Sequence, residues 1–329
     1  MKRPHVMFTG TGRAVPKRIM TNHDFAAIGI DTDDAWIRER TGIRQRHVVG
    51  PGESLTSLSS EAARIAMAAA GVTAAEVDAI IMATISPDHL LPAAAVEVQA
   101  AIGASRAAAF DIDAACTGWI YAVAIAEGLI ATGSAETVLV IGGELLTRIV
   151  NWKDRNTCVL FGDGAGAAIL RHRAHGHGVI ATRMGSNGEL AELLHVPGGG
   201  CAIPITAENV GENLATIRMK GAETFKYAVN AMVDSARQVL DDAGLEPEDL
   251  TCVIPHQANL RIINAVAERL ELPLDRFMVN LDRFGTTSAA AVAIALDEAN
   301  RTGRMKVGDY VLLVVFGGGL TWASSVIQW

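Results

Sequence analysis

The segment from Phe110 to Glu127 carries a cysteine in a setting that suits nucleophilic chemistry. Small residues at positions 114–118, Ala-Ala-Cys-Thr-Gly, predict a tight turn between a buried strand and an apolar helix that begins near Trp119. A helix without a polar face lies inside a protein. Cys116 at its N-terminus would meet free backbone N–H groups and the positive end of the helix dipole, which favour the thiolate. An inert buried cysteine is the ordinary alternative.

A histidine in the second half of the chain is the candidate base for this cysteine. The segment Val253–Asn259 predicts a strand that stops at Pro255 and a helix that starts near Asn259, so His256 stands at the carboxyl end of the strand. In doubly wound sheets chemistry gathers at that edge. Cysteine and histidine at such edges are the arrangement for thiolate nucleophilic catalysis. A structural, hydrogen-bonded histidine is the alternative.

Two internal repeats indicate how these residues are brought together. Residues 63–77 match residues 236–250 at a constant shift of 244 − 71 = 173, and residues 122–126 recur letter for letter at 291–295, a shift of 169. The repeats predict a duplicated α/β fold in which each half is a mostly parallel sheet covered by helices. We place the two halves at residues 1–172 and 173–329.

The second repeat also predicts a neighbour for the cysteine. A shift of 169 sets Thr286 opposite Thr117, the residue that follows Cys116. If the halves are related by a pseudo-twofold axis, the loop 284–288 faces the cysteine turn.

The composition limits the classes of function. The chain has 329 residues, half of them hydrophobic, and a formal charge of −8, which argues against nucleic-acid binding and requires a local basic patch for any acidic partner. Four cysteines without metal spacing fit a reducing compartment. The first residues predict a strand rather than a signal peptide, and no apolar run reaches membrane-spanning length. We therefore expect a cytoplasmic protein without a membrane segment.

Two further segments resemble a metal-binding tract and a phosphate-binding loop, but we assign neither function to them. His172, His175 and His177 lie in a Gly-rich polar run without acidic or cysteine companions, and we interpret residues 171–178 as a solvated linker. The run at 161–166, Phe-Gly-Asp-Gly-Ala-Gly, lacks the Gly-Lys-Ser/Thr ending of a phosphate-binding loop.

Several motifs along the chain resemble those of the thiolase superfamily and, within it, of the β-ketoacyl-acyl-carrier-protein synthase III family. They are DDAWI at 33–37 with RTGIR at 40–44, DAAC at 113–116, FGDGAG at 161–166, PHQAN at 255–259 and FGGGLTW at 316–322. The resemblance covers essentially the whole length. It implies a layered αβαβα fold made of two duplicated halves and assembled as a homodimer, which agrees with the internal repeats.

The resemblance implies a Claisen condensation in two stages. Cys116 would take an acyl group from acyl-CoA, with the thioester oxygen held by the backbone N–H groups of Cys116 and Gly318, an oxyanion hole. Malonyl-acyl carrier protein would then lose CO₂ and attack the acyl group to give a 3-oxoacyl product. His256 would stabilise the enolate oxygen during decarboxylation. No metal or redox cofactor is expected.

The same resemblance assigns binding roles. Trp36 and Arg155 would sandwich the CoA adenine, as stacking and charge favour. The residues implied along the tunnel or at the phosphates and pantetheine are Arg40, Gly221, Ala258 and Asn259. Lys226 and Arg261 would form the basic patch for an acidic carrier protein. Leu91, in the loop 87–92, would close the acyl pocket of the partner subunit, and its replacement of a phenylalanine predicts acceptance of chains longer or more branched than acetyl.

One position departs from the family pattern. Thr286 stands where the family has an asparagine whose amide donates to the same enolate oxygen as the histidine. Losing one such donor can cost roughly 100-fold or more in rate. A threonine hydroxyl can also donate, so our main hypothesis is a working synthase in which Thr286 replaces the amide. Acylation of the thiol should survive the change.

Other functions remain open on this basis. An acyltransferase could pass the acyl group from Cys116 to a non-malonyl acceptor, which would remove the need for the asparagine. A non-catalytic subunit of a heterodimer is a further alternative, although the presence of both Cys116 and His256 counts against it. A thiolase is disfavoured because no cysteine follows Cys252, and an elongating synthase because it has a second catalytic histidine near the position of Thr286.

Overall fold

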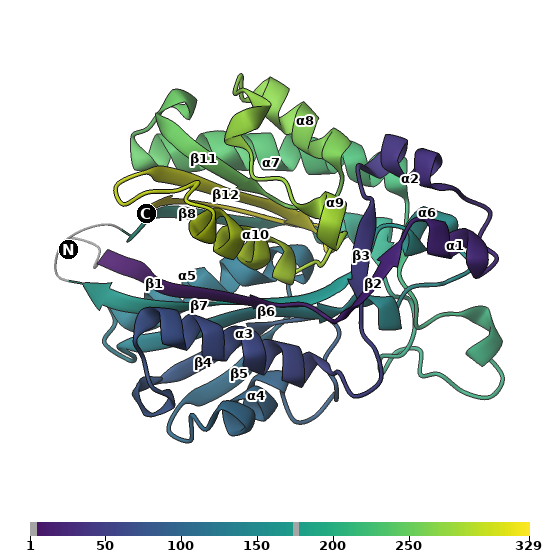
Figure 1. Ribbon diagram of the computed structural model, residues 1–329, viewed down its shortest axis with the longest axis horizontal. Helices are drawn as coiled ribbons and strands as arrows, with labels where there is room; N and C mark the ends of the chain where they lie inside the picture. Colours follow the sequence, from purple (N-terminus) through teal and green to yellow (C-terminus); the bar gives the residue numbers. More distant parts are fainter. Residues whose placement is uncertain (1–4, 174–177) are drawn as a thin grey trace.

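The computed structural model describes residues 5–173 and 178–329 and contains two central β-sheets (Figure 1). In spatial order the first sheet consists of β1 (His5–Ala14), β7 (Asp163–Arg173), β6 (Thr137–Leu145), β4 (Ala79–Ala83) and β5 (Ala108–Ile112). The second consists of β11 (Leu250–Pro255), β12 (Tyr310–Gly317), β13 (Thr321–Gln328) and β8 (Gly178–Ser186). The strands of the first sheet therefore all precede those of the second in the sequence.

Both sheets are mixed, which corrects the expectation of mostly parallel ones. β4 pairs in parallel with β5 and β6, and β11 with β12. The other neighbouring pairs in the two sheets are antiparallel. Only residues 318–320 join β12 to β13. A connection this short can serve an antiparallel pair but cannot make the crossover that parallel strands require.

The helices form three layers around the two sheets (Figure 1). α3 (Leu55–Ala70) and α4 (Ala94–Ile102) cover the outer face of the first sheet. α5 (Gly118–Ala131) and α10 (Ala290–Arg301) lie between the sheets and contact strands of both. α7 (Gly221–Ala243) covers the second sheet, with α8 (Leu260–Arg269) packed beside it. The order of layers is αβαβα, as the sequence predicted.

The two middle helices are buried because most of their residues are small or apolar. Trp119, Ile120 and Val123 of α5 are at most 1% exposed. Two glycines of the first sheet allow the close approach of α10: a Cβ at Gly142 would lie 2.2 Å from the carbonyl oxygen of Ala289, and one at Gly166 would lie 2.5 Å from the Cβ of Ala293. Close packing excludes any side chain at such distances.

The 173-residue repeat corresponds to matching structure. α3 and α7 each end at a glycine in the left-handed region, Gly71 at φ +64° and Gly244 at φ +67°. Each then continues through a 3₁₀ turn, Ala74–Glu76 or Pro247–Asp249, into β4 or β11. Glycine adopts this conformation without strain, which explains its place at both helix ends.

The turns that precede α5 and α10 also correspond to each other. The N–H of Thr117 donates to the carbonyl of Ala114, and the N–H of Ala290 donates to that of Thr287. Both pairs are related by a shift of 290 − 117 = 173.

The backbone angles of these turns agree with that shift. Ala115 has φ +46° and Ser288 has φ +44°, and 288 − 115 = 173. Thr286 is therefore the counterpart of Asp113 and not of Thr117, which corrects the register that the second sequence repeat predicted. The expected juxtaposition of the loop 284–288 with the cysteine turn is nevertheless present, because Thr286 and Cys116 line one cavity.

Short elements complete the fold. They are the antiparallel pair β2 (Arg18–Thr21) and β3 (Gln45–Val48), the pair β9 (Leu194–His195) and β10 (Arg218–Met219), and the helices α1 (His23–Ala27), α2 (Asp34–Thr41), α6 (Arg155–Cys158) and α9 (Leu281–Phe284). None of the helices in the described ranges, 5–173 and 178–329, is long and apolar enough to cross a membrane.

A capping box formed by Ser54 and Ser57 sets the start of α3 at Leu55. β7 includes the glycines of the run at 161–166 from Asp163 onward and continues to Arg173. Residues 171–173 are therefore strand and not linker, while His175 and His177 lie outside the described residues.

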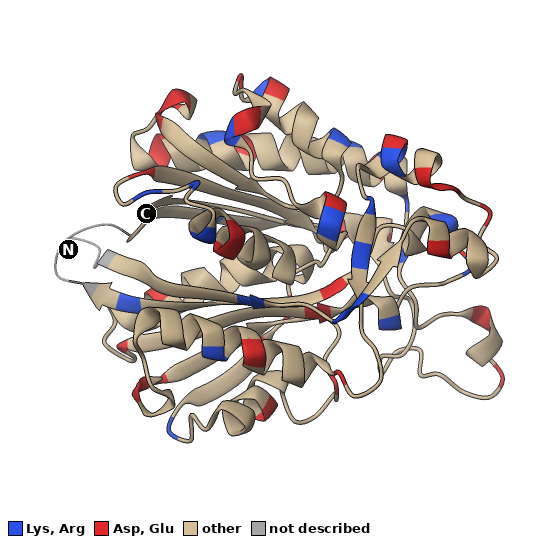
Figure 2. Ribbon diagram, viewed as in Figure 1, with Lys and Arg blue, Asp and Glu red and all other residues tan. Residues whose placement is uncertain are grey.

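Charged side chains lie mainly on the outer helices and loops, whereas the sheets carry few (Figure 2). β6 is an informative exception, since Glu144 occurs near the end of a strand that is otherwise apolar or small and is buried along its whole length. Buried carboxyl groups are rare unless they are paired or hydrogen-bonded, so this position requires a separate explanation.

Candidate active site

Cys116 lies in a 3₁₀ turn, Ala115–Thr117, between the end of β5 and the start of α5. Gly317 at the end of β12 packs against it so closely that a Cβ there would lie 2.8 Å from the Cys116 nitrogen. The backbone N–H groups of Gly318 and of Cys116 itself are directed at the sulfur. Two N–H groups converging on one point form an oxyanion hole when the sulfur carries an acyl group.

The thiol of Cys116 does not have the lowered pKa that the helix terminus predicted. Burial raises the pKa of Cys116 to about 11, and the carboxyl of Glu144 raises it further, while Ser288 and the two backbone N–H groups lower it. Removing a thiolate from water is costly, and here this cost outweighs the donors at the helix end. At neutral pH the group is a thiol, so acylation needs an acceptor for its proton.

His256 follows β11, and its imidazole is 5% exposed. Its backbone N–H donates to the carbonyl of Val314 on β12, which fixes the residue at the sheet edge. Burial lowers the pKa of His256 to about 4, so the ring is neutral at pH 7. Nδ1 is buried and has no hydrogen-bond partner among residues 5–173 and 178–329. A neutral imidazole supplies one N–H donor and one acceptor nitrogen.

A single cavity of about 690 Å³ brings most of the predicted residues together. Cys116, His256 and Thr286 line it. The predicted binding residues along its wall are Trp36, Arg40, Gly221, Ala258, Asn259 and Arg261. A cavity with a thiol, an imidazole, an indole and two guanidinium groups suits a long ligand with an anionic end and an acyl end.

Four predicted residues do not line this cavity. The backbone N–H of Gly318 nevertheless lowers the pKa of Cys116. Lys226 is exposed on α7, and Leu91 is 88% exposed in the loop before α4. Arg155, the first residue of α6, contacts Trp36 from outside the cavity lining.

Trp36 is already covered by two guanidinium groups. The Cζ of Arg40 lies 4.5 Å and that of Arg155 5.0 Å from the centre of the Trp36 ring. Arg155 also donates to the backbone oxygen of Asp31 at 2.6 Å. For a ring to stack between two flat groups, those groups must be about 7 Å apart, which is two contact distances of about 3.5 Å each. An adenine can therefore enter between Trp36 and Arg155 only if Arg155 moves.

Asn259 is an N-cap. Its side-chain oxygen accepts from the N–H of Arg261 at 2.8 Å, and its amide nitrogen donates to the carbonyl of Arg40 at 3.0 Å. It thereby joins the start of α8 to the end of α2, two helices that contribute cavity residues. Capping by asparagine is worth typically about 1 kcal/mol.

Thr286 lines the cavity, and its hydroxyl is hydrogen-bonded to the backbone. Its Oγ1 donates toward the backbone oxygens of Gln257, at 2.9 Å, and Ala258, at 3.0 Å. A hydroxyl carries one proton, and both partners are acceptors only. The expectation that Thr286 replaces the amide donor stays a prediction: in this structure its hydroxyl holds the loop to the segment that follows His256.

The backbone of Thr286 is fixed on its other side as well. Its N–H donates to the carbonyl of Leu160 at 2.8 Å, and its carbonyl accepts from the N–H of Gly162 at 3.0 Å. The loop 284–288 is thus clamped between the 257–258 segment and the 160–162 segment.

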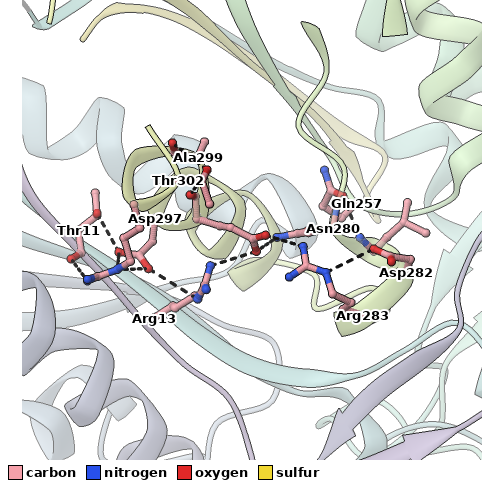
Figure 3. Close-up of polar contacts among 12 residues, drawn as sticks. Thr11, Arg13, Gln257, Asn280, Asp282, Arg283, Asp297, Ala299 and Thr302 are labelled. Carbon is pink, nitrogen blue, oxygen red and sulfur yellow. Dashed lines mark hydrogen bonds and ion pairs between the residues drawn. The ribbon is translucent and has the colours of Figure 1, made fainter. Parts of the chain in front are cut away.

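A buried polar network anchors the helices on both sides of that loop (Figure 3). Glu298 of α10 accepts from Arg283 of α9 at 2.5 Å, from Arg13 of β1 at 3.0 Å and from Asn280 at 3.2 Å. Gln257, next to His256, accepts from the N–H of Asn280 at 2.9 Å. The network connects the histidine edge with α9, α10 and the first sheet.

Sequence comparison identifies the family to which this site belongs. The model described as 3-oxoacyl-[acyl-carrier-protein (ACP)] synthase III matches residues 110–188, and its C-terminal counterpart matches residues 240–329. A beta-ketoacyl-[acyl-carrier-protein] synthase III from Roseiflexus castenholzii is 50% identical over 321 residues, which are 98% of this chain and 97% of that protein. The chain belongs to the synthase III family.

Solved structures agree with this assignment. The 3-oxoacyl-[acyl-carrier-protein] synthase III from Aquifex aeolicus has a TM-score of 0.92 at 44% identity, over 98% of this chain and 100% of that chain. A priming beta-ketosynthase of a polyketide biosynthetic pathway has a TM-score of 0.91 at 33% identity, over 99% and 97%. This synthase III therefore has the thiolase-like fold and is an acyl-transferring condensing enzyme.

Three buried residues near the cavity of this synthase III escaped the sequence analysis. Arg46 of β3 is 0% exposed and donates to the carbonyl of Val159, a cavity residue, at 2.6 Å. Burial lowers the pKa of Arg46 to about 10, which leaves it charged at pH 7. Glu144 raises and Ser288 lowers the pKa of Cys116. In the sequence, Glu144 could have been found as the one charged residue in the otherwise apolar or small run 137–145.

Proposed function

We propose that this synthase III condenses an acyl-CoA primer with malonyl-acyl carrier protein, through an acyl-Cys116 intermediate, to give 3-oxoacyl-acyl carrier protein. This reaction would initiate a fatty acid or polyketide-like chain. The observation that supports it most strongly is the placement of a thiol and a neutral imidazole in one cavity with Trp36 and Arg40.

In the first half-reaction the Cys116 sulfur attacks the acyl carbonyl carbon. The bond from that carbon to the CoA sulfur breaks, and the proton of Cys116 ends on the released CoA thiol. The N–H groups of Cys116 and Gly318, which already point at the sulfur, would receive the carbonyl oxygen as negative charge develops on it.

In the second half-reaction the malonyl group loses CO₂. The electron pair of the broken C–C bond forms an enolate, whose carbon attacks the acyl-Cys116 carbonyl and releases the cysteine sulfur. The neutral His256 ring offers its N–H to the enolate oxygen. Because the hydroxyl of Thr286 is bonded to Gln257 and Ala258, His256 is the side-chain donor on which we base this step.

CoA would extend from Cys116 past Gly221, Ala258 and Asn259 toward Trp36 and Arg40. Arg155 would leave its position on Trp36 and cover the adenine. Its ion pair with Asp31 involves two exposed groups, which makes the contact weak and its rearrangement inexpensive.

The carrier protein would dock at Arg261 and Lys226. Arg261 lines the cavity and Lys226 is exposed on the neighbouring helix α7, so both can meet an acidic surface although the chain carries a net charge of −8. We propose a homodimer as well, since Leu90 and Leu91 are 93% and 88% exposed and apolar side chains this open suit a contact with a second copy.

A second candidate function is transfer of the acyl group from Cys116 to a non-malonyl hydroxyl or amine. The hydrogen bonds of the Thr286 hydroxyl favour it, because its one proton is already directed at the backbone oxygens of Gln257 and Ala258. The first half-reaction is the same in both proposals.

Carbon dioxide release separates the two functions. With acyl-CoA and malonyl-acyl carrier protein labelled in the carboxyl carbon, the condensation proposal predicts stoichiometric release of labelled CO₂ and of 3-oxoacyl-acyl carrier protein. A Cys116→Ala variant is the matched control and should form no product. An intact label together with acylation of Cys116 would refute condensation and support the acyltransferase.

A further inference from the structure

The proposed oxyanion hole takes its two N–H groups from turns that are far apart in the sequence. Cys116 lies in the cysteine turn, residues 114–117, before α5, and Gly318 lies in the glycine turn, residues 317–321, between β12 and β13. A Cβ added at Gly317 would lie 2.8 Å from the nitrogen of Cys116. One added at Gly318 would lie 3.6 Å from the Cβ of Ala115. The two turns are therefore in direct contact.

The hydroxyl groups of Thr117 and Thr321 lie where these turns meet. Oγ1 of Thr117 is 2.9 Å from Oγ1 of Thr321 and 2.7 Å from the carbonyl oxygen of Ala114. Oγ1 of Thr321 is 3.0 Å from the carbonyl oxygen of Gly318 and 3.2 Å from that of Ala114. The four contacts involve the backbone of both turns.

The proton count shows that the Thr117–Thr321 pair links the turns. Carbonyl oxygens only accept, and each hydroxyl has one proton to donate. Two hydroxyl oxygens 2.9 Å apart attract each other only when one donates to the other, so a proton lies between Thr117 and Thr321. Within residues 5–173 and 178–329, no backbone hydrogen bond joins the cysteine turn to the glycine turn. The hydroxyl pair therefore supplies the directional contact between them.

Thr117 is the N-cap residue of α5, but its hydroxyl does not cap the helix. The side chain of an N-cap residue ordinarily accepts from a backbone N–H two or three residues later, as Asn259 does from Arg261 at the start of α8. Thr117 is 0% exposed, and its hydroxyl contacts Ala114 and Thr321 instead. Helix capping therefore does not explain the hydroxyl at this position.

The glycine turn is also anchored away from the cysteine. The N–H of Asn187 donates to the carbonyl of Leu320 at 2.8 Å, and the carbonyl of Asn187 accepts from the N–H of Leu320 at 2.9 Å. Gly319 has φ +138°, and a Cβ there would lie 2.8 Å from Cγ2 of Thr321. Only glycine fits that position. The turn is thus fixed at Leu320 and reaches the cysteine turn through the hydroxyl of Thr321.

We propose that Thr117 and Thr321 are positioning residues that set the distance between the N–H groups of Cys116 and Gly318. The role rests on the proposed acylation, in which these two groups receive the carbonyl oxygen as the sulfur adds to the carbonyl carbon. Neither N–H donates to an oxygen in the described ranges, 5–173 and 178–329, so both are available to a substrate. Oxyanion stabilisation requires donors that are already in place, so moving the glycine turn slows this addition.

The test compares two reactions of the same sulfur. Acylation forms a tetrahedral intermediate whose oxygen needs the two N–H donors, whereas alkylation by iodoacetamide displaces iodide and forms no oxyanion. Both products are mapped to Cys116 by mass spectrometry over time. Loss of either hydroxyl should slow acylation at saturating acyl-CoA roughly 10-fold, with the half-saturating concentration little changed and alkylation within about 2-fold of the wild-type rate.

Paired alanine and serine variants isolate the hydroxyl groups. Thr117→Ala and Thr117→Ser differ from each other only in the hydroxyl, and so do Thr321→Ala and Thr321→Ser. The alanine variants should acylate slowly and the serine variants near the wild-type rate. Equal acylation of the alanine and serine variants would overturn the proposal. Equal losses of acylation and alkylation would overturn it as well, because the hydroxyls would then only shape the cysteine turn. Each position suffices alone if a variant at the other does not fold.

The double variant Thr117→Ala/Thr321→Ala tests whether the two residues act as one unit. Residues that share a hydrogen bond have non-additive effects, so the double variant should acylate about as slowly as the slower single variant. A loss equal to the product of the two single losses would contradict the shared link. Thr182→Ala is the matched control and should match the wild type. Thr182 forms another hydroxyl pair, with Ser325 at 3.0 Å, and does not line the cavity.

A small activated ester separates failure of this role from failure of the proposed function. p-Nitrophenyl acetate acylates a thiol through the same kind of tetrahedral intermediate but needs no CoA site. Wild-type protein that accepts acetyl on Cys116 from this ester, but an acyl group from no acyl-CoA, would overturn the proposed function, and the ester would still decide the role of the threonines. Wild-type protein acylated by neither would overturn both. Normal acylation of the alanine variants would overturn the positioning role alone.

Discussion

Cys116 and His256 both favour their neutral forms at pH 7, because burial raises the pKa of the thiol to about 11 and lowers that of the imidazole to about 4. A neutral pair gives each residue a separate task. In the proposed reaction the thiol is the nucleophile of the first half-reaction, and the imidazole is the donor of the second. Substitutions should therefore separate the two halves.

His256→Ala should retain acylation of Cys116 and lose condensation. Removing the donor to the enolate should lower CO₂ release by roughly 100-fold or more, while the acyl adduct forms within a few-fold of the wild-type rate. The adduct is followed by intact mass and the CO₂ by radiolabel. Equal loss of both half-reactions would show that His256 also serves the thiol.

Thr286→Val tests whether the threonine is a donor or a structural contact. Valine has the same shape without the hydroxyl, and the carbonyls of Gln257 and Ala258 would lose a partner. We expect a loss of about 1 kcal/mol in the free energy of unfolding and a loss of less than 10-fold in CO₂ release. Thr286→Asn is the companion variant. It should raise CO₂ release, since a side-chain amide has two N–H donors and a hydroxyl has only one proton to donate. A 100-fold loss in the valine variant would restore Thr286 as a catalytic donor.

At the scale of elements, α2, α6 and α8 carry residues that we propose bind CoA. Asn259 joins α8 to α2, and Trp36 of α2 carries Arg40 and Arg155 on its ring. If a nucleotide stacks on Trp36 as proposed, it replaces a guanidinium group of the same chain.

Arg40→Ala should weaken acyl-CoA binding without changing the chemistry. We expect KM for acyl-CoA to rise about 10-fold and to become less sensitive to salt, with kcat little changed. Arg38→Ala is the matched control: Arg38 lies on the same helix, pairs with Asp34 and does not line the cavity. A similar KM for the two variants would remove Arg40 from the CoA site.

Local patterns predicted the elements and the reactive edges well. The turn at Cys116, the strand end at His256 and the duplicated helix–glycine–strand units depend on neighbouring residues, which the sequence displays directly. The pKa of Cys116 depends on how deeply the fold buries it, and the direction of the Thr286 hydroxyl depends on carbonyls of a distant segment. Glu144 accepts hydrogen bonds from Thr84, Ile85 and Ser86, far earlier in the sequence, so its setting is visible only in the folded chain.

For the whole molecule, the proposed homodimer would place the loop that carries Leu91 at the acyl pocket of the partner subunit. Leu91 is 88% exposed and lies outside the cavity of its own chain, and β5 is an edge strand of the first sheet. An acyl pocket completed by the partner subunit would tie chain-length preference to assembly.

Leu91→Phe should shift the preference toward shorter acyl-CoAs without changing the molecular mass in solution, because a larger side chain fills the end of the pocket. Leu91→Asp should weaken dimerisation, because it places a charge in an apolar contact. For both variants, kcat/KM across a chain-length series gives the acyl-CoA preference, and sedimentation gives the molecular mass in solution. An unchanged preference in the phenylalanine variant would remove Leu91 from the acyl pocket.

The most direct test of the condensing function is intact mass spectrometry of the protein with acyl-CoAs of increasing length, before and after addition of malonyl-acyl carrier protein. We predict an acyl adduct on Cys116 that disappears as 3-oxoacyl-acyl carrier protein forms. An adduct that persists in the presence of malonyl-acyl carrier protein, and clears only with another nucleophile, would contradict the condensing function.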